Sequence, residues 1–521
     1  MLLGWKNNNR LEPNTFIQCK YAEVAVAQTV RFSTVRRILL VSELGLTRTL
    51  LILGIVVAPY YNIQWPGGGW VGAAVLLFSG CLLALLLSGA SGERLGNVLS
   101  AAGTRLSLFQ IILFGLFAQI GVALITDPVL VSDPRTYLAL AERLAGGMDY
   151  MDEAGHRAFW PPGLPLFLMP FVALFGSGAM AIAVANMVLY MIGAFAAWDL
   201  GRKIFTPQVG ILAALLFTIW PSRLLCAALA SKENLTVAML LAGTTLCLGA
   251  FQSSGRRPWF FAAGAGVSFG LAALAQPGLV LFVAAVPIIF RSAFSVRLQP
   301  YIARSVVVIG CAVMCLLPWH IRNCVVFDGQ FCGIATNGGS VFYRANNPKA
   351  TGLWIEEGEV PISKLPELAQ NQLGFELGKK WIRENPEDFL KLAAKKLVHL
   401  FGDDSYGAAF GILRGGGLDH EQALKNSSPE RLWSYRIASW VSLAFWVMVL
   451  AWSARAIGNI GWNAQFPSSE RLLPLVYPLM YSAAVFSVFE SGSRQHTAAQ
   501  GLLLVLAASF LVNAHAKRRQ Q

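Results

Sequence analysis

The chain has 521 residues, of which 55% are hydrophobic and only 13% are charged, and its mean hydropathy is +0.55. Because soluble domains carry about 25% charged residues, this composition excludes a soluble globule and predicts a polytopic membrane protein. The net charge of +13 does not indicate a nucleic-acid partner, since the Lys and Arg residues lie mostly in short segments between apolar runs, as in the cytoplasmic loops of membrane proteins.

The first segment, residues 1–37, is polar and basic and lacks the apolar core and cleavage site of a signal peptide. We expect it to be a cytoplasmic tail. Residues 38–106 contain two apolar runs, 38–60 and 70–88, which predict two additional N-terminal transmembrane helices. An acid and an arginine inside the first run are costly in hydrocarbon, so an interfacial helix followed by a shorter span is the alternative there.

Residues 107–320 form the core of the predicted membrane body. A helix needs about 17–25 apolar residues to cross the hydrocarbon layer, and with the C-terminal runs we count about twelve spans. The run 164–175 is short, and we expect it not to span. The other runs are 107–126, 178–199, 207–221, 234–252, 259–275, 279–291, 304–319, 437–455, 472–489 and 498–514.

The distribution of basic residues predicts the topology. Both termini are expected in the cytoplasm, and the loop 127–177, called the first loop below, is expected on the extracytoplasmic side of a plasma or inner membrane. Residues 321–436 have an ordinary soluble composition and predict an extracytoplasmic domain, whereas 437–521 return to transmembrane helices and end in a basic cytoplasmic tail. The predicted fold class is an all-α polytopic membrane protein with a small mixed α/β extracytoplasmic domain.

Two local patterns stand out in the extracytoplasmic domain. Residues 324–332 read as a β-hairpin that places Cys324 opposite Cys332, so a disulfide is one outcome in an oxidising compartment. Further on, Asn385 and Pro386 suit the start of a helix and predict a break between two helices.

Asp133 lies just beyond an apolar run, where a carboxylate is a candidate for chemistry. Pro134 and a 3.6-residue apolar period predict a helix after it, stopped by Gly146 and Gly147. The alternative to a chemical role is that Asp133 only caps this helix.

By topology, further polar residues lie on the same side of the membrane as Asp133. Cations among them are suited to binding a lipid phosphate. Each one alone is better explained as an interfacial or snorkelling charge, but their gathering on one side favours a shared site. These residues are Lys232, Glu233, Gln276, His320, Arg322, Glu490, Arg494 and His496.

Other chemistries find little support in the sequence. There is no phosphate-binding glycine loop followed by Lys and Ser or Thr. No Cys or His pairs have zinc-ligand spacing, so no metal site is predicted from spacing. Asp152 and His156 in the first loop are either metal ligands or residues of a solvated loop.

Three separated blocks make the chain resemble the GT-C superfamily of glycosyltransferases, specifically the family 39 type that includes protein O-mannosyltransferases and aminoarabinose transferases. Ser231–Asn234 also resembles a motif of that family. The blocks are Asp133–Ala141 with Gly147, Tyr150 and Trp160–Leu168; Trp319–Asn323 with Thr336–Gly339 and Asn346–Gly352; and Glu490–His496.

The resemblance implies a reaction in which a sugar leaves a polyprenyl phosphate for an acceptor, with inversion by a single displacement. Asp133 would be the base or the group that orients the acceptor. Some members carry Asp-Glu where this chain has Asp133-Pro134. This difference counts against metal use and against a two-acid mechanism in this chain. The donor phosphate would be bound by Arg494, Arg322, Lys232 and His496, with Tyr137, Glu233, Arg157, Trp160 and Glu490 in support.

The expected partners are a polyprenyl-phosphate-linked sugar, a glycan, lipid or protein acceptor, and membrane lipids, with no nucleic acid and no assigned cofactor. A divalent metal has no support from ligand spacing. Two alternatives stay open: a transporter or flippase-like carrier, and a GT-C ligase or polymerase that moves a whole glycan. Transporters commonly show inverted repeats and ions at mid-membrane, and the sequence has no such repeat.

Overall fold

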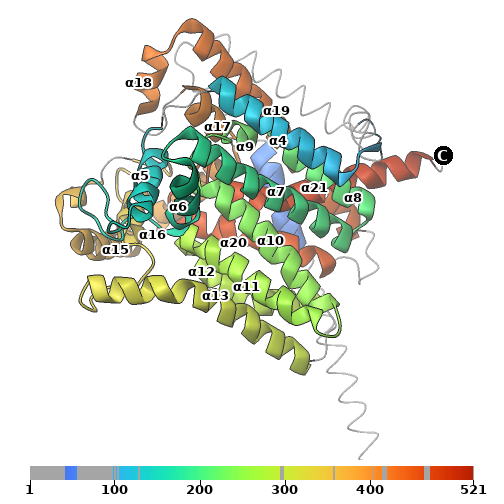
Figure 1. Cartoon of the computed structure of the whole chain (residues 1–521), viewed down its shortest axis with the longest axis horizontal. Helices are drawn as coiled ribbons and strands as arrows, with labels where there is room; N and C mark the ends of the chain where they lie inside the picture. The colour runs from blue at the N-terminus through green and yellow to red at the C-terminus, as the bar shows by residue number, and fades with distance from the viewer. Residues whose placement is uncertain are drawn as a thin grey trace, which may run out of the picture. The chain divides into compact units, whose positions relative to one another are not determined.

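The computed structural model describes residues 42–55, 98, 101, 105–126, 130–293, 298–355, 358–402, 404–413, 419–462 and 470–519. Most of them belong to one compact unit, Thr47–Gln521, whose arrangement from α4 onward is drawn in Figure 1. The predicted span 38–60 lies partly outside the described residues, and its described part, 42–55, is helical. The predicted span 70–88 lies wholly outside them.

The first half of the unit is built from helices joined by short turns. Their bounds are α4 Leu108–Thr126, α5 Asp133–Ala145, α6 Gly163–Phe175, α7 Ala179–Ile204, α8 Pro207–Thr218, α9 Pro221–Leu225, α10 Lys232–Gln252, α11 Arg257–Ala275, the 3₁₀ turn η1 Pro277–Leu279, α12 Val280–Ala293 and α13 Leu298–Val326.

The second half continues with helices and turns whose lengths range from three to 34 residues. They are α14 Gly338–Ala345, η2 Ile362–Lys364, α15 Glu367–Glu384, α16 Pro386–Gly402, α17 Tyr406–Ala408, the π-turn η3 Ala409–Leu413, α18 Asp419–Asn426, α19 Pro429–Trp462, η4 Glu470–Leu472, α20 Leu473–Val488 and α21 Thr497–Arg519. The predicted break at Asn385 and Pro386 is confirmed, because α15 ends and α16 begins there.

Seven helices in the described part of the chain are long and apolar enough to cross a membrane, and four shorter apolar helices accompany them. Each predicted run from residue 107 onward coincides with a helix, so the prediction of an all-α polytopic membrane protein is confirmed. The helix α6 has only 13 residues, fewer than the roughly 17 that a span needs.

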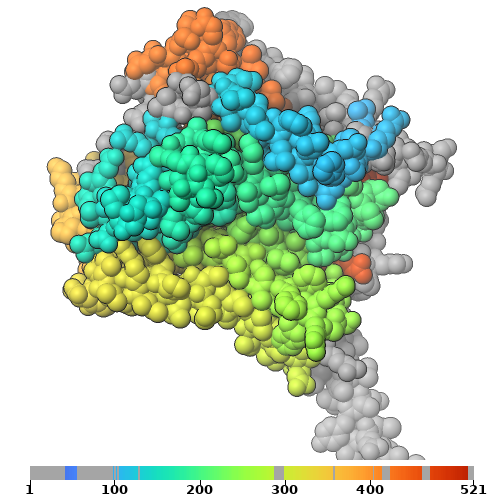
Figure 2. Space-filling view, viewed as in Figure 1, coloured from blue at the N-terminus to red at the C-terminus, as the bar shows by residue number. Residues whose placement is uncertain are grey.

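The helices differ in how much of their surface the protein covers. The apolar window of α10 is 94% buried, whereas that of α4 is 17% buried and that of α13 is 28% buried. Figure 2 shows α4 and α13 at the surface of the face that it draws. Their exposed side chains, such as Phe117 and Met314, are large and apolar, as expected of helices that face lipid.

Two small residues let α11 and α13 approach closely. A Cβ at Gly266 would lie 2.3 Å from the Val308 carbonyl oxygen, and one at Gly270 would lie 2.8 Å from the Cβ of Cys315. The two glycines are four residues apart, on one helix face. This is the small-xxx-small packing that is common between helices in membranes.

The prediction of a mixed α/β domain was wrong, because no strand occurs among the described residues of 321–436. The hairpin predicted at 324–332 was wrong for the same reason. The helix α13 continues to Val326, with Phe327 N–H donating to Asn323, and the chain then reverses through positive φ angles at Asp328 and Gly329. The disulfide itself is present between Cys324 and Cys332.

Candidate functional site

Asp133 and Arg494 form the centre of the candidate site. Asp133 begins α5, and Arg494 lies in the turn between α20 and α21. The guanidinium Nη1 of Arg494 donates to Oδ2 of Asp133 at 2.6 Å. This ion pair joins two of the sequence blocks, which are 361 residues apart in the chain.

Arg494 also lies beside two other acids. Its Nη2 is 3.7 Å from Oε1 of Glu490, and its Nε is 4.0 Å from Oε1 of Glu233. Glu233 is in the first turn of α10 and accepts a hydrogen bond from Ser231 at 2.7 Å. The planar guanidinium therefore faces three carboxylates from three different parts of the fold, a geometry that the forked donors of arginine suit.

Asp133 does not cap its helix. The residue before the helix is Ser132, with no side-chain hydrogen bond to the helix end, and Asp133 stands in the first turn with its carboxylate on Arg494. The alternative that Asp133 serves only as a cap was wrong. A distant cation, rather than the local backbone, decides where this carboxylate points.

The charges around the pair determine how Asp133 titrates. Burial opposes its ionisation, but the charges of Arg494 and Lys232 and the hydrogen bond from Arg494 outweigh burial and lower the pKa of Asp133 below its ordinary value. Burial raises the pKa of Glu490, which Arg494 only partly offsets. The second oxygen of Glu490, Oε2, has no hydrogen-bond partner among the described residues.

Two tyrosines enclose the acids. Tyr137, one turn after Asp133, is 2% exposed, and its ring meets that of Trp160 edge to face at 5.6 Å. Tyr406, in α17, is 6% exposed and shares a side-chain hydrogen bond with Ser231. Burial, strengthened by the nearby carboxylates, raises the pKa of both phenols well above the ordinary value. Tyr406 was not predicted, since nothing in its local sequence signals a site.

Arg322 does not lie against Asp133 but holds the first loop. Its Nη1 donates to the carbonyl of Arg157 at 2.7 Å, and its Nη2 donates to that of Tyr150 at 3.1 Å. Its guanidinium lies 4.8 Å from the ring of Trp319, which meets Tyr150 edge to face. The second block of the resemblance thus anchors the first loop to α13.

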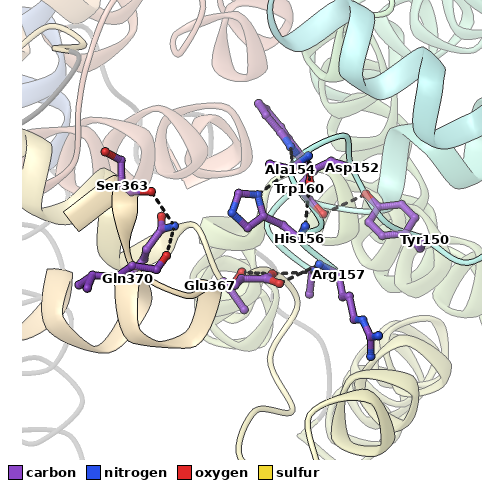
Figure 3. Close-up of polar contacts among 12 residues, drawn as sticks. Tyr150, Asp152, Ala154, His156, Arg157, Trp160, Ser363, Glu367 and Gln370 are labelled. Carbon is purple, nitrogen blue, oxygen red and sulfur yellow. Dashed lines mark hydrogen bonds and ion pairs between the residues drawn. The ribbon is translucent and has the colours of Figure 1, made fainter. Parts of the chain in front are cut away.

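Glu367, at the start of α15, holds the same loop from the other side. Its carboxylate accepts from the backbone N–H of Arg157 at 2.7 Å and of Ala158 at 2.8 Å, and Thr336 donates to it at 2.5 Å (Figure 3). The side chain of Arg157, a predicted supporting residue, is exposed. Glu367 was not predicted, because its partners are about 210 residues away.

The middle of the first loop is organised by Asp152. Its carboxylate accepts from the N–H of Ala154, from the N–H and ring of His156, and from the indole of Trp160, at 2.8 to 3.0 Å (Figure 3). The hydrogen bond to Asp152 raises the pKa of His156. The pKa of Asp152 is lowered, since these hydrogen bonds outweigh its burial.

His496 faces away from Arg494. It is 1% exposed, its Nδ1 donates to the carbonyl of Leu400 at 2.6 Å, and its Nε2 is 3.3 Å from Oδ1 of Asp404. The ring stacks on that of Trp446, with centroids 4.3 Å apart. Asp404 also accepts from the indole of Trp220 at 3.0 Å. The contacts of His496 therefore lie within the protein core, between α16 and α21.

Lys232 lies at the start of α10, half-buried, and its ammonium has no ion pair or hydrogen bond among the described residues. Its positive charge nevertheless favours the ionised form of both Asp133 and Glu490 and so acts to lower their pKa values. Over the same part of the chain, no group of three or more His, Cys, Asp or Glu residues is arranged to hold a metal ion. The three acids around Arg494 share one guanidinium, and Lys232 is a second cation nearby.

Residues 160–320 match the family model described as dolichyl-phosphate-mannose-protein mannosyltransferase. The predicted resemblance to glycosyltransferases of this type is confirmed over these residues, which make up less than half of the chain and do not include Asp133 or Arg494. The matched segment runs from Trp160 in the first loop to His320 in α13 and includes Lys232 and Glu233. No curated protein matches the chain.

Several solved structures are similar to the chain. The oligosaccharyltransferase AglB from Archaeoglobus fulgidus, in complex with an inhibitory peptide and a dolichol-phosphate, is 12% identical over 80% of this chain and 52% of that one, with a TM-score of 0.45. ArnT from Cupriavidus metallidurans, bound to undecaprenyl phosphate, is 14% identical over 78% of each chain, with a TM-score of 0.37. The chain spans about half the length of the archaeal enzyme.

Proposed function

We propose that the protein is a glycosyltransferase that moves a sugar from a polyprenyl-phosphate-linked donor to an acceptor hydroxyl on the extracytoplasmic face of the membrane, with inversion. The ion pair between Arg494 and Asp133 carries this proposal, because it joins a carboxylate that is suited to take a proton to a cation that is suited to bind a phosphate. The family match over residues 160–320 supports the reaction class.

Asp133 has the properties of a general base. Its pKa is lowered, so the carboxylate is ionised at neutral pH. One oxygen, Oδ2, is bound to Arg494, while the other has only a long contact of 3.5 Å with the Ser132 hydroxyl. In the proposed step this carboxylate accepts the acceptor's proton as the acceptor oxygen bonds to the anomeric carbon. The bond from that carbon to the phosphate oxygen breaks, and the phosphate leaves with the electron pair.

The donor phosphate would activate Asp133 by competing for its partner. Arg494 and Lys232 are the two cations whose charges reach Asp133. When a phosphate binds these cations, Arg494 turns from Asp133 to the phosphate oxygens, and the pKa of the released carboxylate rises. A carboxylate with a higher pKa is a stronger base, so donor binding and proton removal are coupled.

Arg322 and His496, expected at the phosphate, are assigned a different part in this proposal. Arg322 holds the first loop through two carbonyls, and His496 holds the turn that carries Arg494 through Leu400 and Asp404. Tyr137, Glu233, Glu490 and Trp160 enclose the pair and restrict its geometry. The sugar and the acceptor are identified by mass spectrometry of the product, which also distinguishes a single sugar from a whole glycan.

The test is the Asp133→Asn variant, reconstituted with a polyprenyl-phosphate-linked sugar and acceptor membranes. Asparagine keeps the shape but cannot accept the proton, so transfer should fall by about 10² to 10⁴, the usual contribution of a general base. The matched control is Asp388→Asn on α16, an exposed acid paired with Lys391, which should leave transfer unchanged. Full activity of Asp133→Asn would exclude the assignment, and movement of intact donor across vesicles without transfer would indicate a carrier.

A further inference from the structure

A groove runs along one face of α5 and ends at Ser132, the residue before Asp133. Its floor is formed by Ser132, Arg135, Ala139 and Arg143, which recur at the spacing of one helical face. The cavity measures about 340 Å³, within the range of about 300–1,000 Å³ found for small-molecule sites. The opposite face of α5, with Tyr137 and Leu138, is buried.

The wall of the groove is formed by the first loop, at residues 151–154 and Trp160. Asp152 fixes this wall through its hydrogen bonds to Ala154, His156 and Trp160. Glu367 and Arg322 then tie the loop to α15 and α13. The wall is thus fixed by Asp152 within it and by Glu367 and Arg322 outside it, as expected of a preorganised site.

The backbone at the end of the groove is strained. Ser132 has φ 55° and ψ −136°, a conformation that costs a non-glycine residue about 1–3 kcal/mol and is concentrated at functional sites. Its hydroxyl is 3.5 Å from Oδ1 of Asp133, the oxygen that faces away from Arg494. A molecule that lies in the groove therefore approaches Asp133 from the side opposite the guanidinium.

The lining combines hydroxyls, an indole, two arginines and two carboxylates, of which Asp152 is occupied by hydrogen bonds within the first loop and Glu153 by Arg135. Arg143 uses its Nε for the carbonyl of Asp149 at 3.0 Å, and its two terminal nitrogens have no hydrogen-bond partner among the described residues. Arg135 is paired with the exposed Glu153 at 3.2 Å. Because Arg135 is already paired, Arg143 is the cation with free donors, and it favours an anionic group at the end of the groove away from Asp133.

We propose that this groove holds the acceptor, an acidic carbohydrate whose hydroxyl faces Asp133 and whose carboxylate or phosphate binds Arg143. The inference rests on the proposed function, to which it adds a substrate class and a place for it. The hydroxyl reaches Oδ1 of Asp133 beside Ser132, while the donor phosphate occupies the opposite side of Asp133, beside Arg494 and Lys232.

The first test probes the groove without turnover. In the full-length protein, Ala139→Cys is labelled with an anionic sulfonate thiol reagent and with a cationic trimethylammonium one, against the wild-type background. The anionic reagent should react about fivefold faster, and Arg143→Gln should remove the difference. Gln372→Cys, exposed on α15, should show no such preference. Equal rates at Ala139→Cys would exclude an anion-binding groove.

Protection of the same cysteine identifies the ligand class. Glucuronate, an acidic sugar, should slow the labelling of Ala139→Cys more than glucose or acetate does at the same concentration, and Arg143→Gln should abolish the protection. Equal protection by acetate would mean that the groove is a simple anion site, and equal protection by glucose would remove the role of Arg143. Either result overturns the proposal.

The second test separates this inference from the proposed function. Ala139→Trp fills the groove, so sugar transfer to acceptor membranes should be lost while undecaprenyl phosphate still raises the melting temperature as it does for the wild type. Full transfer by Ala139→Trp would overturn the acceptor groove alone. If undecaprenyl phosphate does not bind the wild type, the proposed function itself fails. Arg143→Gln, which conserves size, repeats the test if the tryptophan variant does not fold.

Discussion

Glu367 accepts a hydrogen bond of 2.7 Å from the backbone N–H of Arg157, across about 210 residues of chain. The second oxygen of its carboxylate accepts from Ala158 at 2.8 Å. The turn before α15 is fixed in turn by Gln370, which donates to the carbonyls of Ser363 and Leu365 (Figure 3). Glu367 therefore holds the first loop, and Gln370 fixes the turn that precedes the helix of Glu367.

The first prediction concerns this carboxylate. Glu367→Gln removes the charge and leaves one acceptor oxygen for two N–H groups, which should cost about 1–3 kcal/mol locally because a buried donor loses its partner. Hydrogen exchange of the Arg157 and Ala158 amides should accelerate by at least about tenfold, the ratio that corresponds to about 1.4 kcal/mol. Glu376→Gln, exposed on the same helix, is the control. Unchanged exchange at Ala158 would show that Glu367 does not hold the loop.

The second prediction concerns the shape of the cation at the centre of the site. Arg494 spans Asp133, Glu490 and Glu233 with different nitrogens, which the point charge of a lysine does not reproduce. Arg494→Lys should therefore lower the rate of sugar transfer by about 10²-fold, the usual effect of removing one electrostatic donor, and should weaken the binding of undecaprenyl phosphate. As a control, Arg383→Lys, at an exposed arginine of α15, should leave sugar transfer and the binding of undecaprenyl phosphate unchanged. Wild-type turnover by Arg494→Lys would mean that charge alone suffices.

Much of the fold follows from periodicity, and the failures have physical reasons. The helix after Asp133 and the break at Asn385 are local patterns, and both were predicted. Residues 324–332 were assigned to a hairpin because Gly329 ends a three-residue loop between the two cysteines, yet α13 continues to Val326. A polar sequence does not end a helix when its i to i−4 hydrogen bonds continue and its turn comes later, at Asp328 and Gly329.

Residues of the candidate site could be predicted only where a charged side chain falls in a loop that the topology places on the same side of the membrane as Asp133. Lys232, Glu233 and Arg494 were predicted to lie near Asp133, and the structure brings all of them to it. Glu367 has the same local appearance as any acid at a helix start, so its long-range role left no local signal. His496 is two residues from Arg494, but the turn directs it to Asp404 instead. Sequence proximity does not decide side-chain direction in such a turn.

The third prediction concerns the packing of α11 on α13. Gly266→Ala would place a Cβ 2.3 Å from the Val308 carbonyl oxygen, so the helices must separate, at a cost of about 1–3 kcal/mol in the free energy of unfolding. Gly310→Ala on α13 is the control, because nothing lies within 4 Å of its new Cβ. It should be neutral or slightly stabilising, since alanine favours a helix by about 0.5–1 kcal/mol. Melting in detergent compares the two, and equal midpoints would contradict the close approach.

The fourth prediction is a pH dependence that originates at Lys396. This lysine of α16 is fully buried, and its ammonium donates to Oδ1 of Asn346 at 3.0 Å and to the carbonyl of Val488, at the end of α20, at 2.9 Å. Asn346 donates to the same carbonyl. Burial lowers the pKa of Lys396 from 10.5 to about 7. The side chain thus fixes the end of the helix that leads to Glu490.

The sign of this effect follows from proton linkage. Between pH 7 and the unfolded pKa of 10.5, the unfolded chain binds more protons at this residue than the folded one, so stability rises with pH in that window. The melting midpoint of the wild type should therefore increase from pH 7 to pH 9, and Lys396→Met should show a smaller increase because it cannot titrate. Lys395→Met, an exposed neighbour, should behave as the wild type. An unchanged slope in Lys396→Met would mean that Lys396 keeps an ordinary pKa in the folded protein.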